Sequence, residues 1–349
     1  MKICIVTVYN SENCGSFLQA NALRLFLEKQ GHDVRFLWRK KPKGLCFHLY
    51  ESIKKVAKIH FWEAVAEWRK YSVFTKSSKL FQTVKLQEIE NNIDCVVIGS
   101  DTVWNFESSY FFAEKDIFLG RVFHGIKTIT YAASIANTPY EMILRDNTIR
   151  DSILALKAIS VRDEYTKVVV DQITSQDTPV VVDPTLLLDA SEYAQMEAPG
   201  SERDFILVYY FGKMPIMLQR EILRLKEKKA KKLVSFGEYH SWADINVVYD
   251  PAQFLYFFHH ASIVLTNTFH GTVFSVIYQK QFVDFGTDSN KIVDFLERTG
   301  LSGTLCYDSA RIESILSKNI DYVSVQKKIN LFRQKSIEYL SMHLGDRNL

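Results

Sequence analysis

One histidine lies where an imidazole could transfer a proton. His270 opens a predicted helix directly after the predicted strand 263–266, and Gly271 beside it allows a close backbone approach. A helix N-terminus lowers the pKa of an imidazole and stabilises an adjacent anion. A structural role is the default for an isolated histidine, and the other histidines of the chain lack a comparable context. We therefore expect His270 to be catalytic, with Thr268 and Gly271 next to the substrate.

Two charged residues also follow apolar strands directly. Asp101 comes after the predicted strand 95–98, where its carboxylate could accept the proton of a hydroxyl; capping a helix is the alternative. Nearby, Trp104 offers a flat face on which a sugar could stack. The guanidinium fork of Arg162 matches a carboxylate or phosphate, unless it pairs with a structural acid such as Asp163.

Residues 9–16, between the first predicted strand and the helix 17–30, are mostly small or carry amides. This composition frees backbone N–H groups at a helix N-terminus, which suits an anion such as phosphate; an ordinary strand–helix turn is the alternative. The glycine patterns of dinucleotide-binding and P-loop proteins do not occur in the sequence. The sequence therefore supports neither of those two classes.

The elements that must position these side chains alternate between strand and helix. The predicted strands are 3–8, 34–38, 95–98, 128–131, 158–161, 180–182, 205–210, 233–236, 247–249, 263–266 and 282–285. Strands separated by helices form parallel sheets, and such sheets bind ligands outside the carboxyl ends of their strands. Asp183-Pro184, at one of these ends, is interpreted as a turn.

This alternation predicts an α/β fold with two Rossmann-like domains facing a central cleft. We expect an N-terminal domain over 1–199 on the acceptor side and a C-terminal domain over 200–322, because the pattern restarts after residue 200. The closing stretch 323–349 is predicted as a helix that packs back on the N-terminal domain.

The composition excludes several classes of protein. The 349 residues are 47% apolar and 24% charged, which excludes wholesale disorder, and a net charge of +3 is too balanced for a nucleic-acid binder. The five cysteines are scattered without a C-x-x-C motif, and no apolar run reaches the roughly 18 residues of a membrane span. We expect a cytoplasmic protein without cofactor or metal.

The segment 39–79 combines many lysines and arginines with aromatic residues. Amphipathic helices with a solvated charged face explain this composition most simply. The alternative is docking on an anionic membrane surface or a lipid-linked acceptor, because basic and aromatic residues together favour such interfaces.

An ordered set of segments resembles the polysaccharide pyruvyltransferase family. The segments are 8–19, 94–105, 160–163, 183–186, 266–275 and 289–292. The resemblance covers roughly residues 3–300 and implies a fold like that of glycosyltransferase B enzymes. It also implies transfer of a pyruvyl group from phosphoenolpyruvate to two hydroxyls of a sugar, forming a ketal in exopolysaccharide or capsule biosynthesis, without any cofactor.

In that chemistry the acid that protonates the enol carbon would be His270. Arg162 would hold one anionic group of the donor, and Asp101 would accept the hydroxyl proton. The other residues expected at the substrate are Asn13, Gly15, Ser16, Ser100, Trp104, Thr268, Gly271 and Lys291. Many family members carry an arginine where this chain has Thr268, a difference for which Lys291 or Arg298 would compensate unless the donor differs.

Two other functions are compatible with the same fold. One is a glycosyltransferase that uses a nucleotide sugar, although no two glutamates after residue 200 are separated by seven residues, as a donor-binding pair would require. The other is a non-catalytic member of a glycan-assembly complex. The expected partners are phosphoenolpyruvate and a sugar acceptor, including a lipid-linked oligosaccharide, with no nucleic acid.

Overall fold

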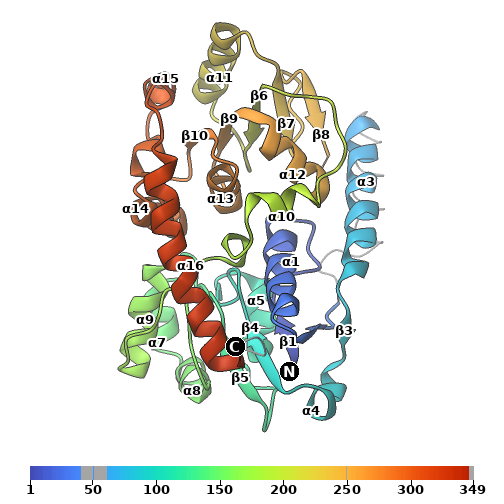
Figure 1. The fold of residues 1–349 in the computed structure, drawn as a ribbon, viewed down its shortest axis with the longest axis vertical. Helices are drawn as coiled ribbons and strands as arrows, with labels where there is room; N and C mark the ends of the chain where they lie inside the picture. Colours follow the sequence, from blue (N-terminus) through green and yellow to red (C-terminus); the bar gives the residue numbers. More distant parts are fainter. Residues whose placement is uncertain (41–49, 51–60, 249, 346–349) are drawn as a thin grey trace.

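The protein folds around two parallel sheets of five strands each. The computed structural model describes residues 1–40, 50, 61–248 and 250–345. The first sheet contains β1 (Lys2–Val6), β2 (Asp33–Leu37), β3 (Thr83–Val84), β4 (Cys95–Ile98) and β5 (Lys127–Thr130). The second contains β6 (Phe205–Tyr209), β7 (Leu233–Phe236), β8 (Ile245–Val247), β9 (Ala261–Thr266) and β10 (Gln281–Asp284). In Figure 1 the first sheet lies in the lower half and the second in the upper half.

The two sheets have the same topology. The first has the order β3-β2-β1-β4-β5, and the second, counted from its other edge, has the order β8-β7-β6-β9-β10. In each sheet the first two strands along the chain are neighbours, and the fourth strand returns to the other side of the first. This is the doubly wound arrangement of a Rossmann-like domain, so the predicted fold class is confirmed.

Helices cover both faces of both sheets, which requires strands that are apolar on both sides. The helices before β6 are α1 (Cys14–Lys29), α3 (Phe61–Ser77), α4 (Ile89–Asn92), α5 (Ser109–Ala113), α6 (Lys115–Phe118), α7 (Tyr140–Leu144), α8 (Asn147–Ala155), α9 (Glu164–Thr174) and α10 (Ala190–Ala194). The later ones are α11 (Ile216–Lys229), α12 (Pro251–His260), α13 (Phe269–Ile277), α14 (Asn290–Thr299), α15 (Ile312–Leu316) and α16 (Tyr322–Leu344).

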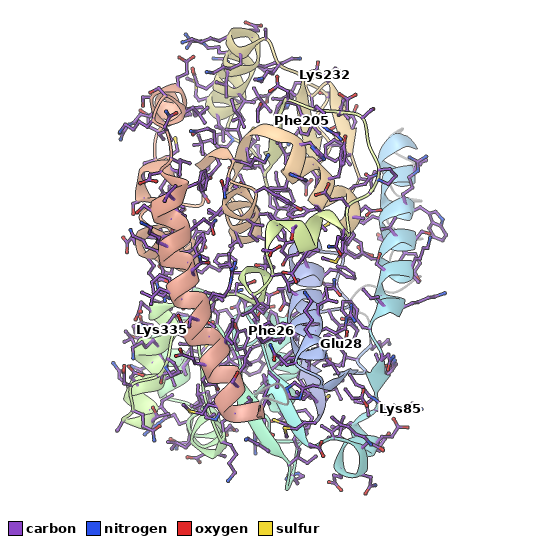
Figure 2. The ribbon with its side chains drawn as sticks, viewed as in Figure 1. Phe26, Glu28, Lys85, Phe205, Lys232 and Lys335 are labelled. Carbon is purple, nitrogen blue, oxygen red and sulfur yellow. The ribbon has the colours of Figure 1, made fainter. Side chains whose placement is uncertain are left out.

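The alternation of side chains along β1 shows how one strand serves two cores. Ile3 and Ile5 belong to one cluster of buried side chains, whereas Cys4 and Val6 belong to another on the opposite face of the sheet. The first of these clusters continues into the second domain. It includes Phe26 on α1 as well as Phe205 on β6, both labelled in Figure 2.

Two of the predicted strands are wrong. Residues 158–161 and 180–182 form only isolated bridges, such as Ile129 with Ala158 and Val161 with Val180. They add single pairs at the edge next to β5, because the chain leaves the sheet at Arg162 and Asp183 to start α9 and a short 3₁₀ helix. The apolar runs predicted buried backbone correctly, but not its pairing.

The C-terminal helix α16 starts beside α14 of the second domain and runs down along the first domain (Figure 1). The ammonium group of Lys127 donates to the carbonyl of His343, and the hydroxyl of Tyr339 donates to the carbonyl of Thr130. Nearer the start of the helix, the hydroxyl of Ser336 accepts a hydrogen bond from the backbone N–H of Val182. Hydrogen bonds therefore join this helix to the first sheet and to the segment that carries Asp183.

Residues 41–49 and 51–60 of the basic aromatic segment lie outside the described residues, so the expected membrane contact there stays a prediction. The described end of the segment forms α3. Within the described parts of the chain, no helix combines the length and the apolar character needed to cross a membrane.

Candidate active site

The candidate site lies where the carboxyl ends of the two sheets face each other. Ligands of doubly wound sheets bind at the point where the strand order reverses, which is between β1 and β4 in the first sheet and between β6 and β9 in the second. The start of α1 follows β1, Asp101 follows β4, and His270 follows β9. A Cβ atom at Gly15 would lie 2.2 Å from His270 Nδ1. The two halves of the site are therefore in contact.

Arg162 is the central cation of the site. Its side chain is 2% exposed, and its Nη1 atom lies 3.0 Å from Asp183 Oδ2 and 3.8 Å from Asp101 Oδ1. The guanidinium carbon lies 4.7 Å from the centre of the Phe269 ring. Its Nε and Nη2 atoms are buried without a hydrogen-bond partner among the described residues. One nitrogen thus holds two carboxylates, and two donor groups remain for an anion.

Asp183 is a site residue that the sequence interpretation missed. The turn was predicted correctly, because Asp183 Oδ1 accepts hydrogen bonds from the Thr185 amide at 3.1 Å and the Thr185 hydroxyl at 2.7 Å. The second oxygen of the same carboxylate pairs with Arg162 and lies 3.8 Å from His270 Nε2. The available signal was its place at a strand end, the criterion that identified Asp101 and Arg162.

The pKa of His270 is affected by burial and by neighbouring charges of both signs. Burial lowers its pKa below the ordinary value, and the carboxylates of Asp183 and Asp101 act against this while Arg162 and Lys291 add to it. Its Nε2 atom is buried without a hydrogen-bond partner among the described residues. The imidazole is therefore neutral near pH 7, and a bound anion would raise its pKa.

Asp101 is held in one orientation by its neighbours. Its Oδ2 atom accepts a hydrogen bond of 2.8 Å from the hydroxyl of Ser16. Its backbone φ of 74° is in the left-handed region, which non-glycine residues adopt mainly where the surroundings enforce it. Burial acts to raise the pKa of Asp101, but the charges of Arg162, His270 and Lys291 outweigh it and hold the pKa below its usual value. The group is thus an ionised carboxylate beside the imidazole.

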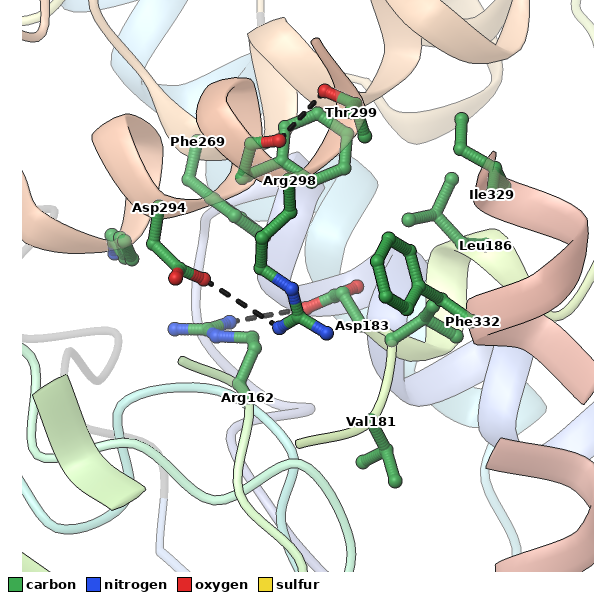
Figure 3. Close-up of a pocket in the computed structure, with 13 residues that line it drawn as sticks. Arg162, Val181, Asp183, Leu186, Phe269, Asp294, Arg298, Thr299, Ile329 and Phe332 are labelled. Carbon is green, nitrogen blue, oxygen red and sulfur yellow. Dashed lines mark hydrogen bonds and ion pairs between the residues drawn. The ribbon is translucent and has the colours of Figure 1, made fainter. Parts of the chain in front are cut away.

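A narrow pocket opens beside Arg162 and Asp183 (Figure 3). Lys291 lines it, and burial together with the charge of Arg162 lowers the pKa of this lysine to about 8. Arg298 also lines it, with Nη1 3.6 Å from Asp294 Oδ2. The opposite wall is apolar and consists of Val181, Val182, Leu186, Phe295, Ile329 and Phe332. The cations expected to compensate for Thr268 thus share one pocket with Arg162.

One expected site residue belongs to the core instead. Trp104 is 1% exposed, and its indole N–H donates to the carbonyl of Phe118 at 2.9 Å. The prediction that a sugar stacks on this side chain is therefore wrong for this structure. Ser100 is also fully buried, and its hydroxyl donates to Gln19 Oε1 at 2.7 Å, so it supports the loop before Asp101.

Three other expected residues, Asn13, Thr268 and Gly271, determine the local structure at the N-termini of α1 and α13. The side chain of Asn13 caps α1 by accepting from the amide of Ser16, and the hydroxyl of Thr268 caps α13 by accepting from the amide of Gly271. A Cβ atom at Gly271 would lie 2.2 Å from the Thr266 hydroxyl oxygen, so this glycine allows α13 to pack closely against β9. Both capped helices direct their N-termini to the site.

The sequence profile of the polysaccharide pyruvyl transferase family matches residues 13–289. The chain belongs to this family. The matched range contains Asp101, Arg162, Asp183 and His270, and it ends two residues before Lys291. Membership makes the protein a transferase of polysaccharide biosynthesis and implies a sugar or polysaccharide acceptor. No curated protein matches the sequence.

Solved structures of sugar enzymes share the fold of this pyruvyl transferase family member. UDP-GlcNAc 2-epimerase from Neisseria meningitidis, bound to UDP-GlcNAc, has a TM-score of 0.53 at 12% identity, over 97% of this chain and 100% of the epimerase. UGT89C1 from Arabidopsis thaliana, complexed with UDP-L-rhamnose, has a TM-score of 0.52 at 11% identity, over 99% of both chains. At such identities the likeness shows the fold alone, which is of the glycosyltransferase B type.

Proposed function

We propose that the protein transfers a pyruvyl group from phosphoenolpyruvate to two hydroxyls of a sugar, forming a ketal. One observation carries this proposal. Asp183 Oδ2 lies 3.0 Å from the buried guanidinium of Arg162 and 3.8 Å from His270 Nε2, and among the described residues neither Nε and Nη2 of Arg162 nor Nε2 of His270 has a hydrogen-bond partner. A small, doubly anionic donor that must be protonated needs these two groups together.

The donor has a carboxylate and a phosphate, and the site offers a cation for each. The Nε and Nη2 groups of Arg162 form a fork that matches one planar anionic group. Lys291 and Arg298 line the same pocket and would neutralise the other. The N-termini of α1 and α13 add partial positive charge from both domains.

The proposed reaction uses each hydroxyl proton once. In the first step His270 protonates the methylene carbon of the donor, the first sugar oxygen bonds to the neighbouring carbon, and Asp101 takes the proton of that hydroxyl. In the second step the second sugar oxygen displaces phosphate from the same carbon, and its proton leaves with the phosphate. The product is a ketal with a new methyl group, and inorganic phosphate is released. Asp101 then gives its proton to solvent, and His270 takes one up from solvent with the next donor.

The lowered pKa of His270 is compatible with its role as the acid, because the negative charge of the bound donor would raise it again. Burial disfavours the charged form of the imidazole and so lowers its pKa in the absence of the donor. Phosphoenolpyruvate would restore a favourable field, so the proton is taken up together with the donor. The imidazolium form of His270 is thereby present only when the donor is bound.

The acceptor is proposed to be a surface-polysaccharide precursor, including a lipid-linked oligosaccharide at the inner face of the membrane. The basic and aromatic residues of 39–79 supply the membrane contact in this proposal. Sedimentation with anionic vesicles tests it: replacing Lys54, Lys55 and Lys58 by glutamate should abolish binding, and unchanged binding contradicts it.

Incubation with phosphoenolpyruvate and candidate acceptors, followed by mass spectrometry, tests the function directly. The expected product carries the added pyruvyl mass and is absent with His270→Gln. Thermal shift gives an independent check, because a bound ligand stabilises the folded state. Stabilisation by UDP or GDP but not by phosphoenolpyruvate would overturn the proposal in favour of a nucleotide-sugar glycosyltransferase.

A further inference from the structure

Away from the active site, three side chains with metal-binding atoms converge. They are Glu197, in the connection between α10 and β6, and His259 and His260, at the end of α12. His259 Nδ1 lies 2.7 Å from Glu197 Oε1, and His260 Nε2 lies 3.4 Å from Glu197 Oε2. One ligand atom from each residue lies within 4.8 Å of the others, and this is the one such group found among the described residues.

We propose that Glu197, His259 and His260 bind one divalent transition-metal ion of the zinc class. Imidazole nitrogen and carboxylate oxygen are ligands that Zn²⁺ accepts, whereas Mg²⁺ and Ca²⁺ prefer oxygen alone. Three protein ligands leave the fourth position of a tetrahedron to water, which gives a site of moderate affinity.

The side chains need to move little to reach coordinating geometry. Zinc–nitrogen bonds of about 2.0–2.1 Å place two ligand atoms of a tetrahedron about 3.4 Å apart. His260 Nε2 already lies 3.4 Å from Glu197 Oε2, whereas His259 Nδ1 lies 2.7 Å from Glu197 Oε1 and has to move away. Rotations about the side-chain bonds cover this difference. The side chains of His259 and His260 are 39% and 21% exposed, so an ion can enter from solvent.

Aromatic neighbours hold these ligands in place. The ring of Tyr278 stacks on His259 at 4.7 Å with an angle of 11° between the planes, and its hydroxyl donates to Glu197 Oε1 at 3.2 Å. The ring of Tyr256 lies 4.6 Å from His260. Packing against these rings restricts the orientation of the two imidazoles, and the Tyr278 hydroxyl restricts that of Glu197.

The nearby cations have other partners: Lys280 donates to the carbonyl of His259, and Arg203 donates to the carbonyl of Glu202 at 2.8 Å.

The position of this cluster suggests a structural role for the ion. His260 directly precedes β9, whereas Thr268 and His270 follow the other end of that strand, so a strand of six residues, or about 20 Å, separates the cluster from the reacting groups. Glu197 belongs to the connection between the sheets, and Ala198 next to it donates to the carbonyl of Ala252 on α12 at 3.0 Å. A bound ion would fasten this connection to α12.

Calorimetric titration of the chelator-treated full chain with Zn²⁺ tests the proposal. We expect one ion per chain, no comparable binding of Mg²⁺, and a Kd raised about tenfold or more by His259→Gln, His260→Gln or Glu197→Gln. His124→Gln is the matched control, because His124 is exposed on the first domain and outside the cluster. Zn²⁺ should also raise the Tm of the wild type but not that of His260→Gln.

Each variant is first compared with the wild type in the absence of metal, so that a loss of folding is recognised from its Tm. Since His259 is the most exposed of the three ligands, its substitution is the decisive case. Absence of Zn²⁺ uptake by the wild type overturns the proposal, and so does unchanged affinity in His259→Gln and His260→Gln.

Discussion

Replacement of Arg162 by lysine separates charge from geometry at the proposed donor site. Lysine keeps a cation near Asp183 and Asp101, which both need one because they are buried carboxylates. Alanine would leave these carboxylates without a counter-charge, at a cost of about 3–5 kcal/mol, and would confuse folding with function. Lysine removes the fork formed by Nε and Nη2 and offers at most one of its two hydrogen bonds.

The expected loss of donor affinity follows from one missing charge-assisted hydrogen bond. Such a bond contributes about 1.5–3 kcal/mol, and about 1.4 kcal/mol corresponds to a factor of ten. We therefore expect phosphoenolpyruvate to bind Arg162→Lys about 10- to 150-fold more weakly than the wild type. Calorimetric titration with phosphoenolpyruvate measures this without knowledge of the acceptor.

The matched control is Arg121→Lys, because Arg121 is 47% exposed in its side chain and pairs with Asp116 at the surface. This control should bind the donor like the wild type. If Arg162→Lys keeps the wild-type Tm and also binds phosphoenolpyruvate with wild-type affinity, the unpaired N–H groups of Arg162 do not hold the donor. The assignment of the anion site would then be refuted.

Three further predictions concern the proton and its surroundings. His270→Gln should bind phosphoenolpyruvate within a few-fold of the wild type while transfer, followed as phosphate release with acceptor, falls at least about a hundredfold; equal turnover would exclude His270 as the acid. Gly15→Ala should reduce transfer to a similar extent, because its Cβ would lie 2.2 Å from His270 Nδ1, whereas Gly303→Ala, with no atom within 4 Å, should leave transfer unchanged. The pKa of Lys291 is about 8, so this ammonium is charged below that pH, and donor affinity should decline as the pH rises through it, by up to about tenfold per unit. Affinity that declines equally in Lys291→Met would assign this pH dependence to another group.

The rule that ligands bind at the carboxyl ends of parallel strands predicted most of the candidate site from the sequence. Asp101, Arg162 and His270 each follow an apolar run that is predicted as a strand, although the run before Arg162 forms only isolated bridges. The structure brings Arg162 within 3.8 Å of Asp101 and 3.0 Å of Asp183, which in turn lies 3.8 Å from His270. Residues that are far apart in the chain could be joined because parallel strands end at a common edge. Their chemical roles stay predictions.

The failures have physical causes that a pattern of residue types does not carry. Trp104 also follows a strand end, but its N–H reaches a carbonyl fourteen residues further along the chain and its ring fills the core. Asp183 was recognised as a turn residue, yet a carboxylate has two oxygens and the second one serves the site. Glu197 is 62 residues from His259, so no spacing motif could relate them. In all three cases the tertiary contact, not the local sequence, decides the role.

The division of the candidate site between two domains would couple donor binding to catalysis in the proposed reaction. The carboxylates and Arg162 come from the first domain, whereas His270 and Lys291 come from the second. Gly15 and His270 touch across the boundary, so the imidazole meets Asp183 and Asp101 only when the two sheets face each other as they do here. A donor bound by cations of both domains, Arg162 from one and Lys291 from the other, would favour this arrangement because its two anionic groups are short and rigidly linked. In this arrangement the charged side chains of Asp101, Arg162 and Asp183 are buried, and electrostatic interactions are stronger in such a site than in solvent. In the proposed reaction, donor recognition and proton transfer would therefore depend on each other at the boundary between the domains.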